Sequence, residues 1–172
     1  MVYILVLLGA ILRFLPHPAN FAPITALAIF GGVYLRNRKL AIVIPLAAML
    51  VSDYFIGFYH LPVMLSVYLS FAISGLLGLW LKKHKTLNNT IGVTLFASVQ
   101  FYLLTNFAVW AFGSLYPPDA QGLLASYVNA LPFFRNTLLG DFFYVGVLFG
   151  AYELVTRFFP IFKKKRPETA AD

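Results

Sequence analysis

The chain has 172 residues, of which 60% are hydrophobic, 17% aromatic and only 11% charged, and its mean hydropathy is +0.81. A soluble chain carries roughly 25% charged and roughly 45–50% apolar residues, so this composition excludes an ordinary soluble enzyme and a disordered chain. The absence of cysteine excludes a disulfide-stapled scaffold. The composition predicts a protein that is solvated by lipid, with no room for a separate soluble domain.

Apolar stretches separated by breakers and basic clusters predict six membrane-spanning helices. In chain order the spans are residues 2–14, 21–35, 40–57, 63–81, 90–112 and 137–159. A weaker stretch at 121–134, shortened by Pro132, predicts an interfacial or re-entrant half helix before the last span. The expected fold is an all-α membrane protein: one helical domain over residues 1–160, with six transmembrane helices, followed by a basic cytoplasmic tail at 161–172. The first span lacks the basic region and cleavage site of a signal peptide, so we expect it to be retained.

The net charge of +7 comes mainly from three short clusters between the apolar runs. They are Arg36, Arg38 and Lys39; Lys82, Lys83 and Lys85; and Lys163, Lys164, Lys165 and Arg166. Short basic loops stay on the cytoplasmic side, so the clusters predict a multi-pass membrane protein with both termini in the cytoplasm. A nucleic-acid partner is not expected, because no soluble face exists to present these charges.

Polar residues inside the apolar runs fall almost entirely in the half expected to face outward. The candidate ligand-binding residues among them are Arg13, His17, Asn20, Asp53, Asn106, Trp110, Asn136 and Asp141. A charge at the bilayer centre costs at least about 2.5–3.5 kcal/mol, so such residues face a partner or a wet cavity. Two compatible interpretations stay open: Arg13, Asp53 and Asp141 form an ion-pair network that holds three helices together, or they frame a ligand.

The spacing of the candidate residues predicts how they would meet a ligand. Asn106 and Trp110 are four residues apart and share one helix face. A helix start at Asn136 and Thr137 would offer a capping side chain and free N–H groups to an anionic or carbonyl group. Trp110 has an ordinary alternative role, because Trp and Tyr collect at headgroup depth in any membrane protein.

Catalytic and metal-binding motifs are missing from the sequence. His17 and His60 lie in outward loops without His-x-x-x-His spacing, Cys or clustered Met, so they indicate turn-forming or capping roles. No metal and no cofactor is expected. The sequence has no Gly-x-Ser-x-Gly elbow, no His-Glu-x-x-His and no phosphate-binding glycine loop, which disfavours an enzyme.

Small residues recur with a period of four on three of the spans. They are Ala22 and Ala26, then Ala28 and Gly32; Ser70, Ser74 and Gly78; and Gly146 and Gly150. Small residues let helix backbones approach closely inside a membrane. The stripes indicate either packing within this bundle or a docking face for a second membrane protein.

Several motifs together carry a resemblance to a known family. They are Arg13-x-x-Pro16-His17-Pro18-x-Asn20-Phe21-x-Pro23-x-x-Ala26-Leu27-Ala28-x-Phe30-Gly31-Gly32, Ser52-Asp53, Tyr102-Leu-Leu-Thr-Asn106-Phe-x-x-Trp110, Tyr116-Pro117 and Pro132-Phe133-Phe134-x-Asn136-Thr137-x-x-Gly140-Asp141. Over about residues 10–150 the chain resembles an uncharacterised family of bacterial transport proteins. That family looks like a relative of the substrate-binding S components of energy-coupling-factor (ECF) transporters.

The resemblance implies a six-helix bundle that captures a micronutrient, often a vitamin or its precursor, from the extracytoplasmic side. Such a subunit does not hydrolyse ATP, and it works with a membrane coupling subunit and cytoplasmic ATPases. S components typically carry an Ala-x-x-x-Ala docking pattern in the first helix, and residues 2–14 have none. The nearest equivalents are Ala22/Ala26 and Ala28/Gly32 in the second span.

The leading hypothesis is therefore a substrate-binding membrane protein for uptake of a small, ring-containing solute. In this hypothesis Arg13, Asp53 and Asp141 set the charge of the pocket and Trp110 stacks on the ligand. Hydrogen bonds come from Asn20, Asn106 and Asn136. The alternative is an integral membrane enzyme or accessory subunit that acts on a lipid-linked or periplasmic substrate, and a third possibility is a scaffold subunit.

Overall fold

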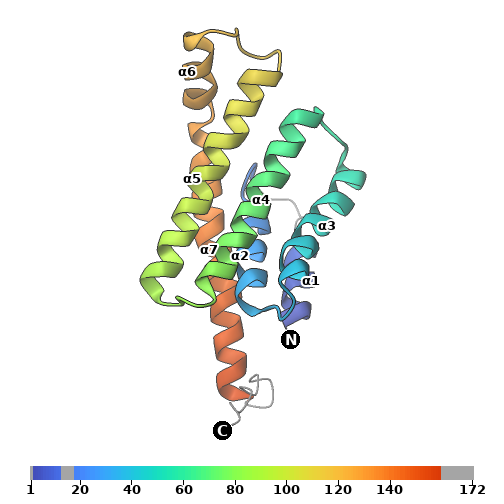
Figure 1. The fold of residues 1–172 in the computed structure, drawn as a ribbon, viewed down its shortest axis with the longest axis vertical. Helices are drawn as coiled ribbons and strands as arrows, with labels where there is room; N and C mark the ends of the chain where they lie inside the picture. Colours follow the sequence, from blue (N-terminus) through green and yellow to red (C-terminus); the bar gives the residue numbers. More distant parts are fainter. Residues whose placement is uncertain (1, 13–17, 160–172) are drawn as a thin grey trace, which may run out of the picture.

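The fold is a bundle of α-helices in a computed structural model that describes residues 2–12 and 18–159. The helices are α1 (Val2–Leu12), α2 (Ile24–Tyr34), α3 (Arg38–Ile56), α4 (Leu61–Leu81), α5 (Leu87–Phe112), α6 (Ala120–Asn129) and α7 (Leu131–Phe158). Helix α6 lies at one end of the long axis, and the far end of α7 lies at the other (Figure 1). No strand occurs in the described ranges, so the all-α prediction is confirmed there.

Four helices, α3, α4, α5 and α7, are long and apolar enough to cross a membrane. The shortest has 19 residues and spans roughly 28 Å, close to the hydrocarbon thickness of about 30 Å. By contrast, α1 and α2 have 11 residues each and reach only about 16 Å. The structure therefore supports a membrane protein with four full-length helices in the described chain. The count of six crossings and their orientation stay predictions.

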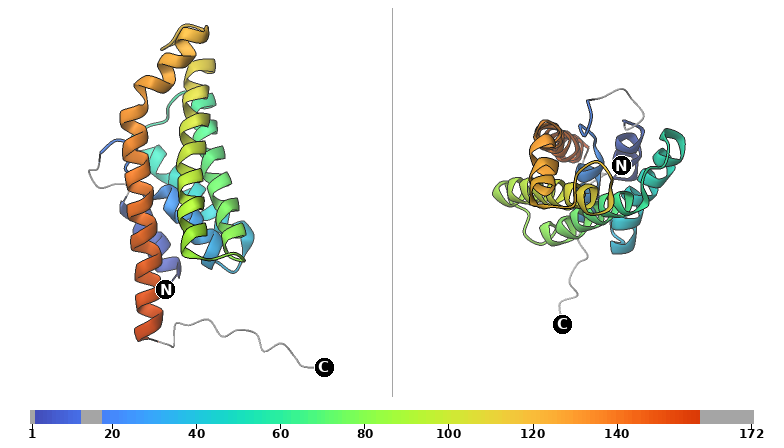
Figure 2. Two further views of the ribbon diagram at one scale, coloured as in Figure 1. Left: turned by 90° about the vertical axis from the view of Figure 1, so that its left-hand side faces the viewer. Right: turned by 90° about the horizontal axis from the view of Figure 1, so that it is seen from above.

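Helix α2 is the buried centre of the bundle. Its residues from Ile24 to Val33 are all buried, and it contacts α1, α3, α4, α5 and α7. Figure 2 shows it enclosed by the longer helices. A helix satisfies its own backbone hydrogen bonds, and one that is enclosed by protein needs no lipid-facing surface. Its short length is therefore compatible with a position deep in the membrane.

Glycines let α2 and α4 touch backbone to backbone. A Cβ at Gly32 would lie 2.6 Å from the carbonyl carbon of Gly78, and a Cβ at Gly78 would overlap the Ile29 carbonyl oxygen. Ala26 and Ala28 on α2 are fully buried, as are Ser70 and Ser74 on α4. The small-residue stripes of α2 and α4 therefore pack within this bundle, and neither the Ala28/Gly32 stripe nor the α4 stripe is a docking face.

The last span begins earlier than the sequence predicts. Helix α6 is capped by Asp119, whose Oδ1 accepts from the Gly122 N–H at 2.7 Å, and it ends at Asn129. Helix α7 then begins at Leu131, so the predicted start at Thr137 is wrong. Pro132 lies in the first turn of α7, where its missing N–H would have no helical acceptor. The sequence indicates Pro132 as the limit of the half helix, but Pro132 instead lies in the first turn of α7, the longest helix described.

Candidate functional site

A cavity of about 470 Å³ lies at the end of the bundle that carries α6. Its walls come from the first turns of α2, the second half of α3, the first half of α4, the last turns of α5 and the start of α7. The aromatic members of the wall are Tyr59, Phe71, Phe101, Tyr102, Phe133 and Phe134. The volume falls within the range of about 300–1,000 Å³ that is typical of small-molecule pockets.

Asp141 is the carboxylate of this cavity, and its residue is only 2% exposed. Its Oδ2 accepts a hydrogen bond from Ser98 Oγ of α5 at 2.7 Å, and the Thr25 side chain of α2 also hydrogen-bonds the carboxylate. Three helices therefore meet at one acidic group. Among the described residues no Lys or Arg lines the cavity. A buried carboxylate without a cation is costly unless hydrogen bonds satisfy it, and the two hydroxyls supply such bonds.

Helical spacing explains how the polar groups reach the cavity. Asn106 follows Tyr102 by four residues, and its Nδ2 donates to the Tyr102 carbonyl at 2.8 Å. Asp141 likewise follows Thr137 by four residues, and both line the cavity. Residues four apart lie on one helix face, so α5 and α7 each turn a polar stripe inward among aromatic neighbours.

Three of the predicted site residues line this cavity: Asn20, Asn106 and Asp141. Asn20 is exposed in the segment before α2 and has a φ of 63°, the left-handed region that Asn adopts more readily than most residues. The backbone conformation of this turn by itself favours Asn at position 20, whether or not its side chain contacts a ligand. The predicted residues Arg13 and His17 lie outside the described residues.

Asp53, Trp110 and Asn136 are placed elsewhere by the structure. Asp53 is 1% exposed and accepts from the Tyr68 hydroxyl at 2.8 Å, which links α3 to α4. Trp110 Nε1 donates to the Pro117 carbonyl at 3.1 Å and so holds the loop that follows α5. None of the three is a wall residue of the cavity.

Asn136 does not begin a helix, because α7 starts at Leu131. The predicted anion site of free N–H groups at Asn136 and Thr137 is therefore wrong, since both residues lie beyond the first turn of a continuous helix. The Asn136 Nδ2 instead donates to the Ala19 carbonyl at 3.0 Å and ties the segment before α2 to α7.

Sequence reasoning missed the hydroxyl partners of Asp141 and the aromatic walls. Ser98 and Thr94 are four residues apart on α5, and Ser98 Oγ also lies 3.1 Å from the Thr94 carbonyl. This spacing was a usable signal for a polar face on α5. The aromatic walls carried no such signal, because Phe and Tyr are spread over every face of the spans and only packing selects those that line a cavity.

Comparison with known proteins gives a family. A model for a family of unknown function, DUF6580, matches residues 1–164. The chain belongs to the DUF6580 family. No curated protein and no solved structure matches the chain. The match agrees with the predicted resemblance to an uncharacterised family, whereas the further resemblance to ECF S components stays a proposal.

The DUF6580 chain has a second hollow at the opposite end, which we call the basic-end groove. It measures about 530 Å³ and lies between α5 and α7, with Thr86, Thr90, Thr94, Gly146 and Gly150 in its lining. A Cβ added at Gly146 or at Gly150 would meet nothing within 4 Å. These two glycines therefore leave open space beside α7, unlike the glycines between α2 and α4.

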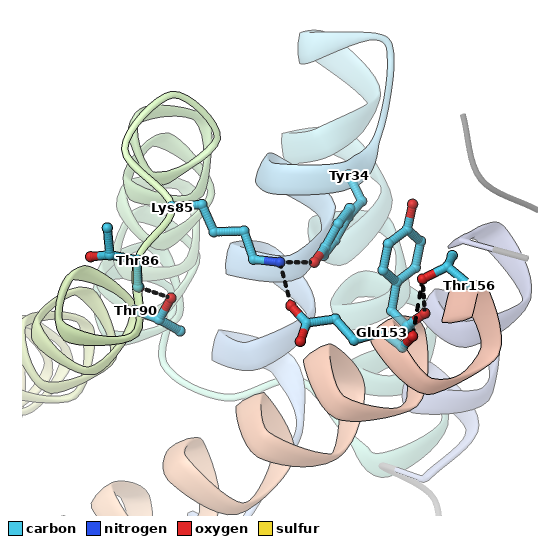
Figure 3. Close-up of polar contacts among 7 residues, drawn as sticks. Tyr34, Lys85, Thr86, Thr90, Glu153 and Thr156 are labelled. Atoms are coloured by element: carbon cyan, nitrogen blue, oxygen red, sulfur yellow. Dashed lines mark hydrogen bonds and ion pairs between the residues drawn. The ribbon is translucent and has the colours of Figure 1, made fainter. Parts of the chain in front are cut away.

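Lys85 and Glu153 line the basic-end groove and belong to a charged cluster (Figure 3). The Lys85 Nζ donates to Glu153 Oε1 at 2.6 Å and to the Tyr34 hydroxyl, so it joins the α4–α5 loop to α2 and α7. Burial by itself would lower the pKa of Lys85, but the hydrogen bonds to Glu153 and Tyr34 favour the charged form and raise that pKa above its ordinary value. In the described ranges, no three His, Asp or Glu side chains gather in a group able to hold a metal ion.

Proposed function

We propose that this DUF6580 protein is a substrate-binding membrane subunit, similar to the S components of ECF transporters, that captures a small micronutrient. The observation that carries the proposal is the cavity at the α6 end of the bundle. Its walls are mainly aromatic and apolar, and a few polar groups, with Asp141 deepest among them, converge on one space. Mostly apolar walls with a small number of placed polar groups are the usual build of a small-molecule site.

The proposal places the α6 end outside the cell and the basic end in the cytoplasm. The α2–α3 connection and the first turn of α3 carry Arg36, Arg38 and Lys39, and the α4–α5 connection carries Lys82, Lys83 and Lys85. Short loops rich in Lys and Arg stay in the cytoplasm, so both basic segments support this orientation. When the short helices α1 and α2 are counted as crossings, the chain spans a bacterial inner membrane six times, with both termini in the cytoplasm.

Uptake through such a subunit needs an energy source from partners. The sequence has no phosphate-binding glycine loop, so ATP would be hydrolysed by separate cytoplasmic ATPases, joined through a membrane coupling subunit. Because Ala28 is buried in the bundle and Gly32 packs against α4, the coupling subunit would have to contact another face.

A thermal-shift screen of the purified protein against vitamins, nucleobases and small amines tests capture directly. A ligand that binds only the folded state raises the melting temperature by mass action. A Val109→Trp variant fills the cavity wall and should abolish the shift, whereas Val147→Trp, on a surface that is 46% exposed, should keep it. Shifts that survive in Val109→Trp would place binding elsewhere. Turnover of a compound without any ATPase partner would favour the enzyme alternative.

The absence of cysteine makes the orientation measurable. A single cysteine at Ser114, after α5, should react with a membrane-impermeant maleimide from outside intact cells. A single cysteine at Lys83, after α4, should react only after the cells are opened. Both positions are exposed in the fold, so a difference in labelling would report the side of the membrane and not burial. The reverse pattern would invert the proposed orientation and place the cavity on the cytoplasmic side.

A further inference from the structure

We infer that the ligand of the cavity is a compact, flat cation that donates hydrogen bonds through N–H groups, such as an amidinium, a guanidinium or a protonated amino-heterocycle. The inference rests on the proposed function, because it names the ligand class of the same cavity. It follows from counting which hydrogen-bond donors and acceptors the wall leaves for a guest.

Three of the wall hydroxyls, those of Tyr102, Thr105 and Thr137, already donate their hydrogens to backbone carbonyls. Thr105 Oγ1 donates to the Phe101 carbonyl at 2.8 Å, and Thr137 Oγ1 donates to the Phe133 carbonyl at 3.0 Å. The Tyr102 hydroxyl donates to the Tyr127 carbonyl at 2.7 Å. A hydroxyl has one hydrogen and two lone pairs, so each of these oxygens can still accept but can no longer donate.

Asn106 and Asp141 add further hydrogen-bond acceptors to the cavity wall. Asn106 gives one of its two amide hydrogens to the Tyr102 carbonyl, and its Oδ1 accepts from no described residue. The Asp141 carboxylate accepts from Ser98 and Thr25, and these two bonds leave lone pairs unused, since a carboxylate offers about four acceptor sites. With no Lys or Arg in the described lining, acceptors outnumber donors.

The aromatic walls favour the same guest. Phe71 and Phe101 lie 5.4 Å apart between ring centroids at 31°, and Tyr102 and Phe134 lie 4.6 Å apart at 37°. The faces of aromatic rings carry negative charge density and attract cations placed over them. A flat cation could therefore lie against a ring face while its N–H groups reach Asn106 and Asp141.

An anionic guest meets the opposite conditions. It would bring further acceptors to a wall of acceptors, and a carboxylate beside Asp141 would be repelled and left without hydrogen bonds. Burying a polar group without a hydrogen-bond partner costs more free energy than a typical hydrogen bond contributes. The cavity would therefore both attract cations and exclude anions.

Three probes of one shape separate the alternatives: benzamidinium, benzamide and benzoate share a flat ring and a planar three-atom substituent, and differ in charge and in N–H count. Their binding to the full-length protein in detergent is measured by thermal shift and by calorimetry. Benzamidinium should bind most tightly, benzamide at least tenfold more weakly, and benzoate not at all. Equal or tighter binding of benzamide or benzoate, or no binding of benzamidinium, overturns the inference.

Variants at the two polar positions tie the result to this cavity. Asp141→Asn should weaken benzamidinium by about tenfold to a hundredfold, the effect of losing a hydrogen bond to a charged group. Asn106→Asp keeps the side-chain size, adds a carboxylate and should tighten benzamidinium, so the test stands even if Asp141→Asn fails to fold. Glu153→Gln removes a carboxylate from the opposite end of α7 and should leave the affinity for benzamidinium unchanged. An equal effect of Glu153→Gln and Asp141→Asn would overturn the assignment.

Failure of the ligand class and failure of the proposed function give different results. If the cation does not bind while an anionic or neutral compound of the broader screen binds in a Val109→Trp-sensitive way, the capture site stands and only the inferred class is wrong. If no compound of either set binds the wild-type protein, the proposed function fails with it.

Discussion

The two hollows of the protein are similar in size but are built in opposite ways. The cavity at the α6 end takes wall residues from five helices and their connecting segments, six of these residues being aromatic, around a carboxylate that is 2% exposed. The basic-end groove lies between only two helices, and its α7 wall includes Gly146 and Gly150, where an added Cβ would meet nothing within 4 Å. Volume alone therefore does not identify a binding site. The first hollow is lined by side chains that converge from five helices, whereas the second is a gap between two helices that borders two glycines.

Glycine substitutions give the largest expected effect. Gly78→Ala would push a methyl group into the backbone of α2, so we expect a loss of about 3 kcal/mol or more in the free energy of unfolding. Gly146→Ala enters the open groove and should be neutral or stabilising by up to about 1 kcal/mol, because alanine loses less conformational entropy in a helix. Thermal unfolding in detergent measures both. Equal losses would show that the groove is as closely packed as the α2–α4 contact.

Removal of one hydroxyl at the cavity should have an intermediate effect. Ser98→Ala takes away the donor to Asp141 Oδ2, and we expect it to cost about 1–2 kcal/mol of unfolding free energy, as for hydrogen bonds between helices in a membrane. Ser66→Ala is the matched control, because Ser66 Oγ donates only within its own helix, to the Val63 carbonyl. The prediction fails if the two variants unfold at the same temperature.

The charged cluster of the basic-end groove should have the smallest effect. Glu153 is 62% exposed and Lys85 33%, so Lys85→Met should cost only about 0–1 kcal/mol. Because the folded state raises the pKa of Lys85, its contribution is complete below the ordinary value of 10.5 and is lost as pH rises through the higher folded value.

A pH series checks this sign. Wild type and Lys85→Met should differ most in melting temperature at neutral pH and should converge above pH 10.5. Lys83→Met is the control at an exposed neighbouring position and should show no such convergence. A difference that grows with pH would contradict the stabilising role of the Lys85 charge.

The amide and carboxylate residues of the candidate site followed from polarity alone. Asn106 and Asp141 stood out because amides and carboxylates inside apolar runs are costly in lipid and must face something polar. The same reasoning did not separate Asp141, which lines the cavity, from Asp53, which is engaged by Tyr68. Both are carboxylates within a long apolar span, and only the packing of neighbouring helices decides which one borders a hollow.

The sequence by itself determined that the protein is helical, apolar enough to span a membrane and basic at one set of loops, because composition and period are local properties of the chain. It also marked Asn20, Asn106 and Asp141 as candidate site residues. The tertiary structure alone decided that α2 is buried in the centre, which polar groups line the cavity, and which glycines pack against a neighbouring helix and which face open space. These features depend on the distance between residues far apart in the chain, and no local pattern encodes that distance.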